Sequence, residues 1–214
     1  FLSPRGQVDV KFLFEEYLML PQHLLTFLAP DFWGNPGAYN YFGAGFYHEK
    51  MIYLGLPILV LALFALFSKT KKRELTFFKW FGLVTLALGF VPLGWLLYYS
   101  GLPLFKTMIP SRIFVLPTFG FCVMAAFGVD LFLKEKSDQK IWKIIFMGLG
   151  LVFIFLWGWV FYQRLVFPES NYARVSFRNL ILPTIFFLAT VLIIIVANWR
   201  FLKIKKSLIF VFLF

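Results

Sequence analysis

Several charged side chains stand out in this apolar sequence because their types suit acid–base chemistry. Asp31 follows Pro30 and precedes two aromatic residues, whereas His48 and Glu49 are neighbours just before a long apolar run. A carboxylate and an imidazole can act as a general base and its orienting partner, or as ligands of a divalent cation. We therefore expect Asp31, His48 and Glu49 to line a polar site. The alternatives are structural roles, a turn or N-cap for Asp31 and a favourable helix start for Glu49.

Two cations, Lys106 and Arg112, lie in a short apolar loop of sequence GLPLFKTMIPSR, which contains two prolines. An arginine at or near membrane depth needs an anionic partner, and the guanidinium group matches the geometry of a phosphate. We predict that Arg112, with Lys106 as a second candidate, binds the phosphate of a lipid. The alternative is that Arg112 extends to the headgroups from the start of the next helix.

The composition indicates the medium that surrounds these residues. The 214 residues are 61% hydrophobic and 14% charged, whereas soluble domains are nearer half apolar and a quarter charged. The net charge of +11 comes from short basic clusters between apolar runs, which argues against a nucleic-acid partner and favours membrane lipid. Cys122, the single cysteine, lies in an apolar run, so no disulfide within the chain is expected and no metal ligand is assigned.

Five apolar runs approach or exceed the roughly 17 to 25 residues that a membrane-spanning helix needs. They cover about 51–67, 80–99, 113–133, 144–162 and 180–199, and a sixth run, 207–214, is too short to span. Backbone groups in lipid must be paired within their own segment, and these runs lack the alternation of barrel strands. The sequence predicts an all-α, polytopic transmembrane helical bundle of five full spans and one truncated span. We therefore expect the chain to be a piece of a longer protein.

The basic residues predict how the spans are oriented. Lysine and arginine concentrate in the loops 68–79, 134–143 and 200–206, and the alternating loops contain fewer of them. Cytoplasmic loops of membrane proteins carry such an excess of positive charge. We predict a multi-pass protein of a bacterial cytoplasmic membrane, with residues 1–50 outside.

Residues 1–50 form the first of two predicted regions, and residues 51–214 form the helical bundle. Apolar residues between 12 and 28 would give one side to one or two short helices, broken at Pro21, that lie along the membrane interface. The glycines, prolines and asparagines between 30 and 45 favour turns over helix. The first region is thus an external segment of short interfacial helices and turns.

Three stretches, taken in chain order, resemble the YfhO-like bacterial membrane proteins, a family grouped with the GT-C type glycosyltransferases. They are LPQHLLTFLAPDFWGN, then Tyr47-His48-Glu49 followed by MIYLGLPILVLALFAL, and then LPLFKTMIPSRIFVLPTFGFCVMAAFGVDLF. The resemblance covers roughly residues 18–133. It implies an enzyme that takes a sugar from a polyprenyl-phosphate carrier on the outer face of the membrane and passes it to a cell-envelope acceptor.

The resemblance also implies roles for single residues. Arg112, and with it Lys106, would stabilise the charge of the leaving lipid phosphate. Asp31, His48 and Glu49 would line the external cavity, near the acceptor or a divalent cation. The catalytic acidic residue of such enzymes is expected upstream of this chain, so no catalytic residue is assigned.

Two other functions fit the same composition. A transporter or flippase for lipid-linked saccharides would need ionisable residues inside its spans, and these spans contain few apart from Asp130. Asp130 has the spacing of a helical ion pair with Lys134. A scaffold subunit that binds lipid or partner helices is the remaining alternative.

Overall fold

The computed structural model describes residues 18–90, 93–100, 110–134 and 139–198, and all regular elements in these ranges are helices. In chain order they are η1 (Pro21–Phe27), η2 (Pro36–Ala38), α2 (Tyr47–Lys50), α3 (Leu56–Phe67), α4 (Arg73–Leu88), α5 (Leu93–Tyr99), η3 (Pro110–Phe114), α7 (Val115–Lys134), α8 (Gln139–Val166) and α9 (Asn171–Asn198). The predicted all-α fold is therefore confirmed for the described residues. The truncated run 207–214 lies outside them.

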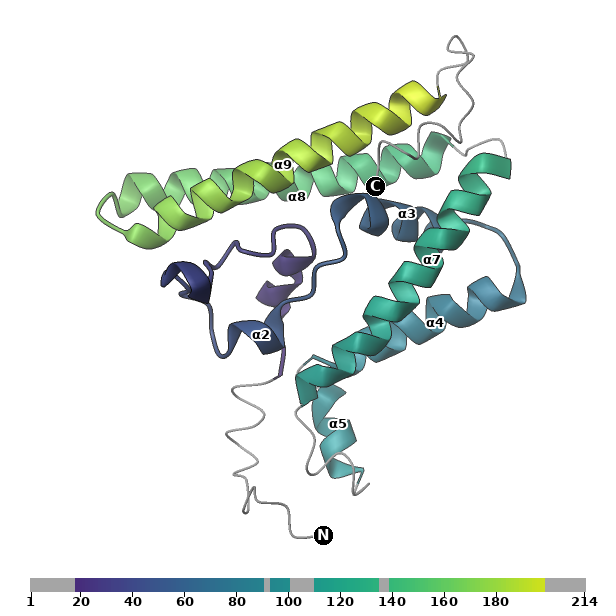
Figure 1. The fold of residues 1–214 in the computed structure, drawn as a ribbon, viewed down its shortest axis with the longest axis horizontal. Coiled ribbons are helices and arrows are strands. Elements are labelled where there is room, and N and C mark those ends of the chain that lie inside the picture. The colour runs from purple at the N-terminus through teal and green to yellow at the C-terminus, as the bar shows by residue number, and fades with distance from the viewer. Residues whose placement is uncertain (1–17, 91–92, 101–109, 135–138, 199–214) are drawn as a thin grey trace.

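Three helical segments are long and apolar enough to cross a membrane: Ser111–Leu133, Gln139–Val166 and Asn171–Ala197. They correspond to the last three predicted full spans. α8 and α9 have 28 residues each, which at 1.5 Å per residue gives about 42 Å, more than the roughly 30 Å of a hydrocarbon core. They form an antiparallel hairpin whose length leaves room for contacts outside the membrane (Figure 1).

The first predicted span, 51–67, contains a helix too short to cross a bilayer. Its helix, α3, has 12 residues, or about 18 Å, and the residues from Met51 to Gly55 are not helical. Gly55 has a φ of +88°, which side-chain-bearing residues rarely adopt, and the helix then begins with Pro57 in its first turn. Most of α3 is buried in the protein, as is usual for apolar helices of this length.

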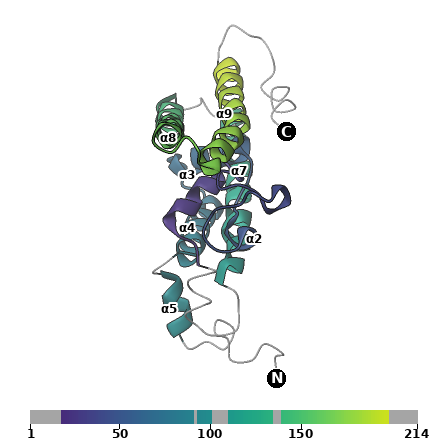
Figure 2. The same ribbon diagram turned by 90° about the vertical axis from the view of Figure 1, so that its left-hand side faces the viewer.

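The second predicted span, 80–99, is divided between two helices. α4 already begins at Arg73 and ends at Leu88, and α5 begins at Leu93. Pro92 lacks a backbone N–H and disfavours helical geometry in the residue before it, which explains why the apolar run does not form one helix. In both views α5 lies at the end of the molecule farthest from the hairpin (Figures 1 and 2).

α7 crosses α3 and α4 at close range because glycines face the contacts (Figure 1). A Cβ added to Gly128 would lie 2.2 Å from the Leu61 carbonyl oxygen of α3, and one added to Gly120 would lie 3.1 Å from the Gly82 Cα of α4. Small residues allow helix backbones to approach in this way in membrane proteins. At the end of α7, Asp130 pairs with Lys72 at 3.2 Å. The side chain of Lys134, its predicted partner, is outside the described part.

The described part of the external segment packs against the bundle (Figures 1 and 2). The 3-10 helix η1 starts at Pro21 where a break between helices was predicted, and residues 12–17 are outside the described ranges. Phe27 is buried, and its ring meets the Phe121 ring of α7 edge-on with 5.9 Å between the centroids, whereas Leu24 is 43% exposed. Phe27 of η1 therefore faces α7, and the expectation that residues 12–28 lie along the membrane interface stays a prediction.

Candidate functional site

The single turn of α2 contacts polar residues from two distant parts of the sequence, Asp31 on one side and Ser111 with Arg112 on the other. The Tyr47 hydroxyl donates a 2.6 Å hydrogen bond to the Asp31 Oδ1 atom. Two residues later, the Glu49 Oε2 atom accepts a 2.6 Å hydrogen bond from the Ser111 hydroxyl. The Glu49 Oε1 atom lies 4.0 Å from the Arg112 Nε atom. Of the predicted site residues, Glu49 and Arg112 are thus in direct contact, and Asp31 reaches the same turn through Tyr47.

Asp31 lies in an ordered turn that is attached to the helical hairpin. Its carboxylate also accepts a 3.1 Å bond from the Asn35 amide, while its backbone oxygen accepts a 2.6 Å bond from the Asn179 side chain of α9. The backbone oxygen of the next residue accepts a 2.9 Å bond from the Ser176 hydroxyl. The turn is therefore held to α9 through main-chain oxygens, which leaves the Asp31 carboxylate directed to Tyr47.

Burial and the hydrogen bond to Asp31 both raise the pKa of the Tyr47 phenol above its ordinary value of 10. The phenol therefore keeps its proton at neutral pH and remains a donor to the carboxylate. This pair gives Asp31 a defined orientation, which a side chain at the tip of an isolated turn would not have.

Arg112 enters the site from η3, the short helix that leads into α7. Ser111 is buried, whereas the Arg112 side chain is 58% exposed and that of Glu49 only 21%. The contact between Glu49 and Arg112 is long and involves Nε, so most of the guanidinium group is accessible to an anion. A phosphate could bind here beside Glu49.

The remaining predicted site residues do not join this arrangement. His48 is exposed, and its ring meets the Tyr47 ring edge-on with 5.5 Å between the centroids. Lys106 lies outside the described residues. Where side chains are described, no group of three His, Cys, Asp or Glu residues is placed to hold a metal ion. Asp31, His48 and Glu49 are therefore not placed to hold the predicted divalent cation together, and the reaction proposed below gives a metal ion no role.

Two buried polar side chains at the end of α2, Lys50 and His23, were not predicted as site residues from the sequence. Lys50 and His23 are each 1% exposed, and together with Thr26 and Trp33 they line a small cavity of about 10 Å³. The His23 Nδ1 atom accepts a 3.2 Å bond from the Leu20 N–H. Burial first, and then the Lys50 charge, lower the pKa of His23 to about 4, so its ring is neutral at pH 7. No sequence signal distinguishes His23 within the apolar stretch around it.

A larger cavity of about 170 Å³ opens where the external segment meets the turn of the hairpin. Its walls combine the Trp33, Phe42, Trp159 and Tyr172 rings with the polar side chains of Gln163 and Ser170, among others. Phe42 and Tyr172 are stacked with 4.6 Å between their centroids. Aromatic faces with a few polar groups are the usual lining of a small-molecule pocket. Asp31 lies next to it in the chain, since Phe32 and Trp33 are part of its wall.

Fold and site together define an all-helical chain, within the described ranges, with three membrane-length helices and a polar site where α2 meets the start of α7. Comparisons with protein-family models, with curated proteins and with solved structures gave no match. The resemblance to the YfhO-like proteins stays a prediction from sequence.

Proposed function

We propose that this chain is part of a membrane glycosyltransferase that takes a sugar from a polyprenyl-phosphate carrier at the outer face of the membrane, for transfer to a cell-envelope acceptor. The observation that carries the proposal is the contact of Glu49 with Ser111 and Arg112. It brings the predicted phosphate ligand Arg112 next to Glu49, one of the carboxylates predicted to line the cavity, and Tyr47 of the same turn holds the Asp31 carboxylate. The aromatic cavity beside the Asp31 turn adds a place of suitable chemistry for a saccharide.

The orientation of the membrane helices is part of this proposal. In it, α7, α8 and α9 cross the bilayer, α3 and the α4–α5 pair complete five membrane segments, and the basic loops 68–79 and 134–143 face the cytoplasm of a bacterial cell. The ion pair of Lys72 with Asp130 then lies at the inner end of α7, and Arg112 lies at its outer end. Accessibility of single cysteines at Thr70 and Ser170 to a membrane-impermeant reagent in intact cells tests this: Ser170→Cys should react and Thr70→Cys should not.

In the proposed reaction the bond between the anomeric carbon of the sugar and a phosphate oxygen breaks, and negative charge grows on the departing lipid phosphate. Arg112 would donate hydrogen bonds to that phosphate and stabilise the charge more strongly in the transition state than in the bound donor. Glu49 would act as a positioning residue, because it restrains the guanidinium group through its Nε edge. The acceptor hydroxyl must lose a proton to a base, for which no residue of this chain is assigned.

The test uses the full-length protein in detergent or nanodiscs, with undecaprenyl phosphate as the binding probe. Loss of charge-assisted hydrogen bonds predicts that Arg112→Ala weakens binding about 10- to 100-fold. Arg174→Ala is a matched control, since Arg174 is an exposed arginine near the start of α9. Transfer from a labelled lipid-phosphate sugar should fall about 100-fold or more. Wild-type binding and transfer by Arg112→Ala would remove the assignment.

A further inference from the structure

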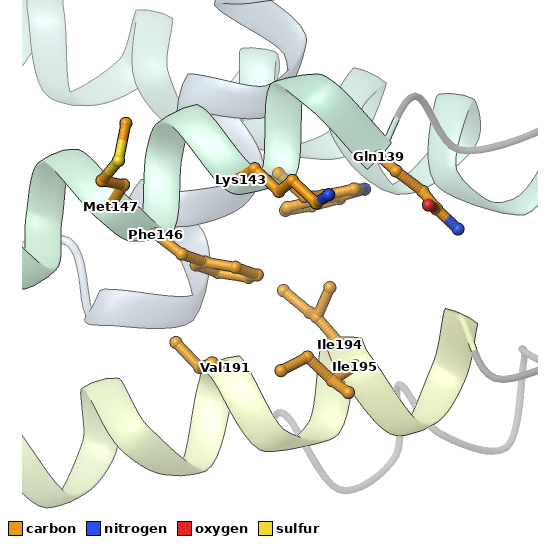
Figure 3. A pocket seen from close by; sticks show the side chains of 8 residues that line it. Gln139, Lys143, Phe146, Met147, Val191, Ile194 and Ile195 are labelled. Atoms are coloured by element: carbon orange, nitrogen blue, oxygen red, sulfur yellow. The ribbon is translucent and has the colours of Figure 1, made fainter.

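A groove separates α8 from α9 at the end of the hairpin away from its turn (Figure 3). Its volume is about 590 Å³, and its lining is almost entirely apolar. The lining residues are Gln139, Trp142, Lys143, Phe146, Met147, Val191, Ile194 and Ile195. This end of the hairpin is remote from the 170 Å³ cavity, which lies at the turn.

The groove exists because aromatic side chains close the hairpin in its middle and leave it open here. Phe153 and Phe187 stack between the two helices with 4.9 Å between their centroids. Closer to the start of α8, the Trp142 ring instead stacks on Phe64 of α3 at 4.2 Å, and it also meets Phe132 of α7 edge-on. The Trp142 ring thus packs against α3 and α7, and it leaves the space toward Val191 and Ile194 of α9 open as the groove.

The open end of the groove is polar and positively charged. In Figure 3 the side-chain ends of Gln139 and Lys143 lie at the end of the groove near the start of α8, whereas Phe146 and Val191 lie deeper along the hairpin. None of the lining residues is acidic. Two exposed lysines, Lys140 and Lys143, lie in the first two turns of α8. The first turn of α8 adds the partial positive charge of a helix N-terminus.

We propose that this groove binds an anionic glycerophospholipid, with part of one acyl chain between α8 and α9 and the phosphate at Lys143. An acyl chain matches the apolar walls, and helices long enough to cross a membrane expose such a groove to lipid. The charge at the open end selects an anionic headgroup over phosphatidylcholine, whose choline cancels the phosphate charge. The proposal does not depend on the transferase function.

The experiment places a photoreactive p-benzoylphenylalanine at Phe146 of the full chain in nanodiscs of phosphatidylcholine with one fifth phosphatidylglycerol. Mass spectrometry then identifies the crosslinked lipid. A lysine beside the headgroup predicts about fivefold enrichment of phosphatidylglycerol over its share of the bilayer. Lys143→Gln should reduce the ratio to the bilayer share, whereas Arg164→Gln, which removes a charge at the opposite end of α8, should leave it unchanged.

Two controls keep the outcome decisive. The same photoreactive residue at Ile154, a 70% exposed position on α8, should crosslink lipids in proportion to the bilayer. If the Phe146 variant does not insert, Met147, which also lines the groove and is 64% exposed, replaces it. Crosslinking of the two lipids at the bilayer ratio in the wild-type background would overturn the proposal. So would crosslinking to protein, whether to residues 199–214 or to a second copy of the chain.

Discussion

The Glu49 Oε1 atom lies 4.0 Å from the Arg112 Nε atom, and Glu49 also accepts a hydrogen bond from Ser111, 62 positions further along the chain. A carboxylate in this place both orients the guanidinium group and competes with any incoming anion. These two effects predict opposite results for removal of its charge.

Glu49→Gln should tighten the binding of undecaprenyl phosphate by a few fold, because the amide can still accept from Ser111 while the competing charge next to Arg112 is gone. The measurement is a dissociation constant in nanodiscs, with Glu169→Gln, a change at an exposed acidic residue in the hairpin turn, as the charge-matched control. Weaker binding by Glu49→Gln would show that orientation of Arg112 outweighs competition.

Tyr47→Phe should destabilise the protein by about 1 to 2 kcal/mol, since it removes a partly buried hydrogen bond to a charged carboxylate. Thermal unfolding in detergent measures the change. Tyr39→Phe is the matched control, because Tyr39 is 98% exposed. Equal unfolding temperatures for Tyr47→Phe and the wild type would show that Asp31 is held by Asn35 and the turn alone.

Stability should depend on pH through His23. The pKa of His23 is about 4 in the folded protein against 6.5 ordinarily, because burial and then Lys50 disfavour the charged ring. Between these values the unfolded chain binds more protons, so stability is fully present above pH 6.5 and falls as the pH drops toward 4, by up to about 3 kcal/mol. Denaturant unfolding across this range should show the slope in the wild type.

The matched variants for this pH dependence are His23→Gln and His48→Gln. His23→Gln should flatten the slope between pH 4 and 6.5, and His48→Gln should retain it because His48 is exposed. The same slope in the wild type and His23→Gln would assign the effect to other groups.

Gly128→Ala should destabilise the bundle by about 1 to 3 kcal/mol, because its new methyl group would lie 2.2 Å from the Leu61 carbonyl oxygen and force α3 away from α7. Gly148→Ala provides the control on α8, where nothing lies within 4 Å of the added Cβ. That change should be neutral or slightly stabilising, since alanine favours helix more than glycine does. Thermal unfolding of the two variants is the measurement. Equal unfolding temperatures for Gly128→Ala and Gly148→Ala would contradict the close approach of α3 and α7.

The long helices could be predicted from sequence because their signal is local. A run of apolar residues such as 113–133 or 144–162 specifies helix in any apolar medium. The apolar run 51–67 is no less apolar than these, yet it contains only a short helix, which begins after the non-helical Gly55 and is largely buried in the protein. Hydropathy does not report whether lipid or protein surrounds a segment. Pro92 predicts a helix break within the run 80–99. The length of the run nevertheless favours a single span.

The site was predictable only in its parts. Glu49 and Arg112 stand out as charges beside apolar runs, yet their contact depends on how α2 packs against η3, which no spacing in the sequence encodes. His23 has no such signal, because a histidine among leucines can be buried or exposed with the same local pattern. Tertiary packing decided both outcomes.

The hydrogen bonds from Ser176 and Asn179 to the external segment end on main-chain oxygens, those of Phe32 and Asp31. Every residue type supplies such an oxygen, so this attachment does not depend on which side chains occupy positions 31 and 32. Evolution could therefore exchange the carboxylate at position 31 for another functional group without dislodging the loop, provided that the two donors on α9 are kept. The hairpin would then hold the loop in the same position while the functional side chains of the loop change.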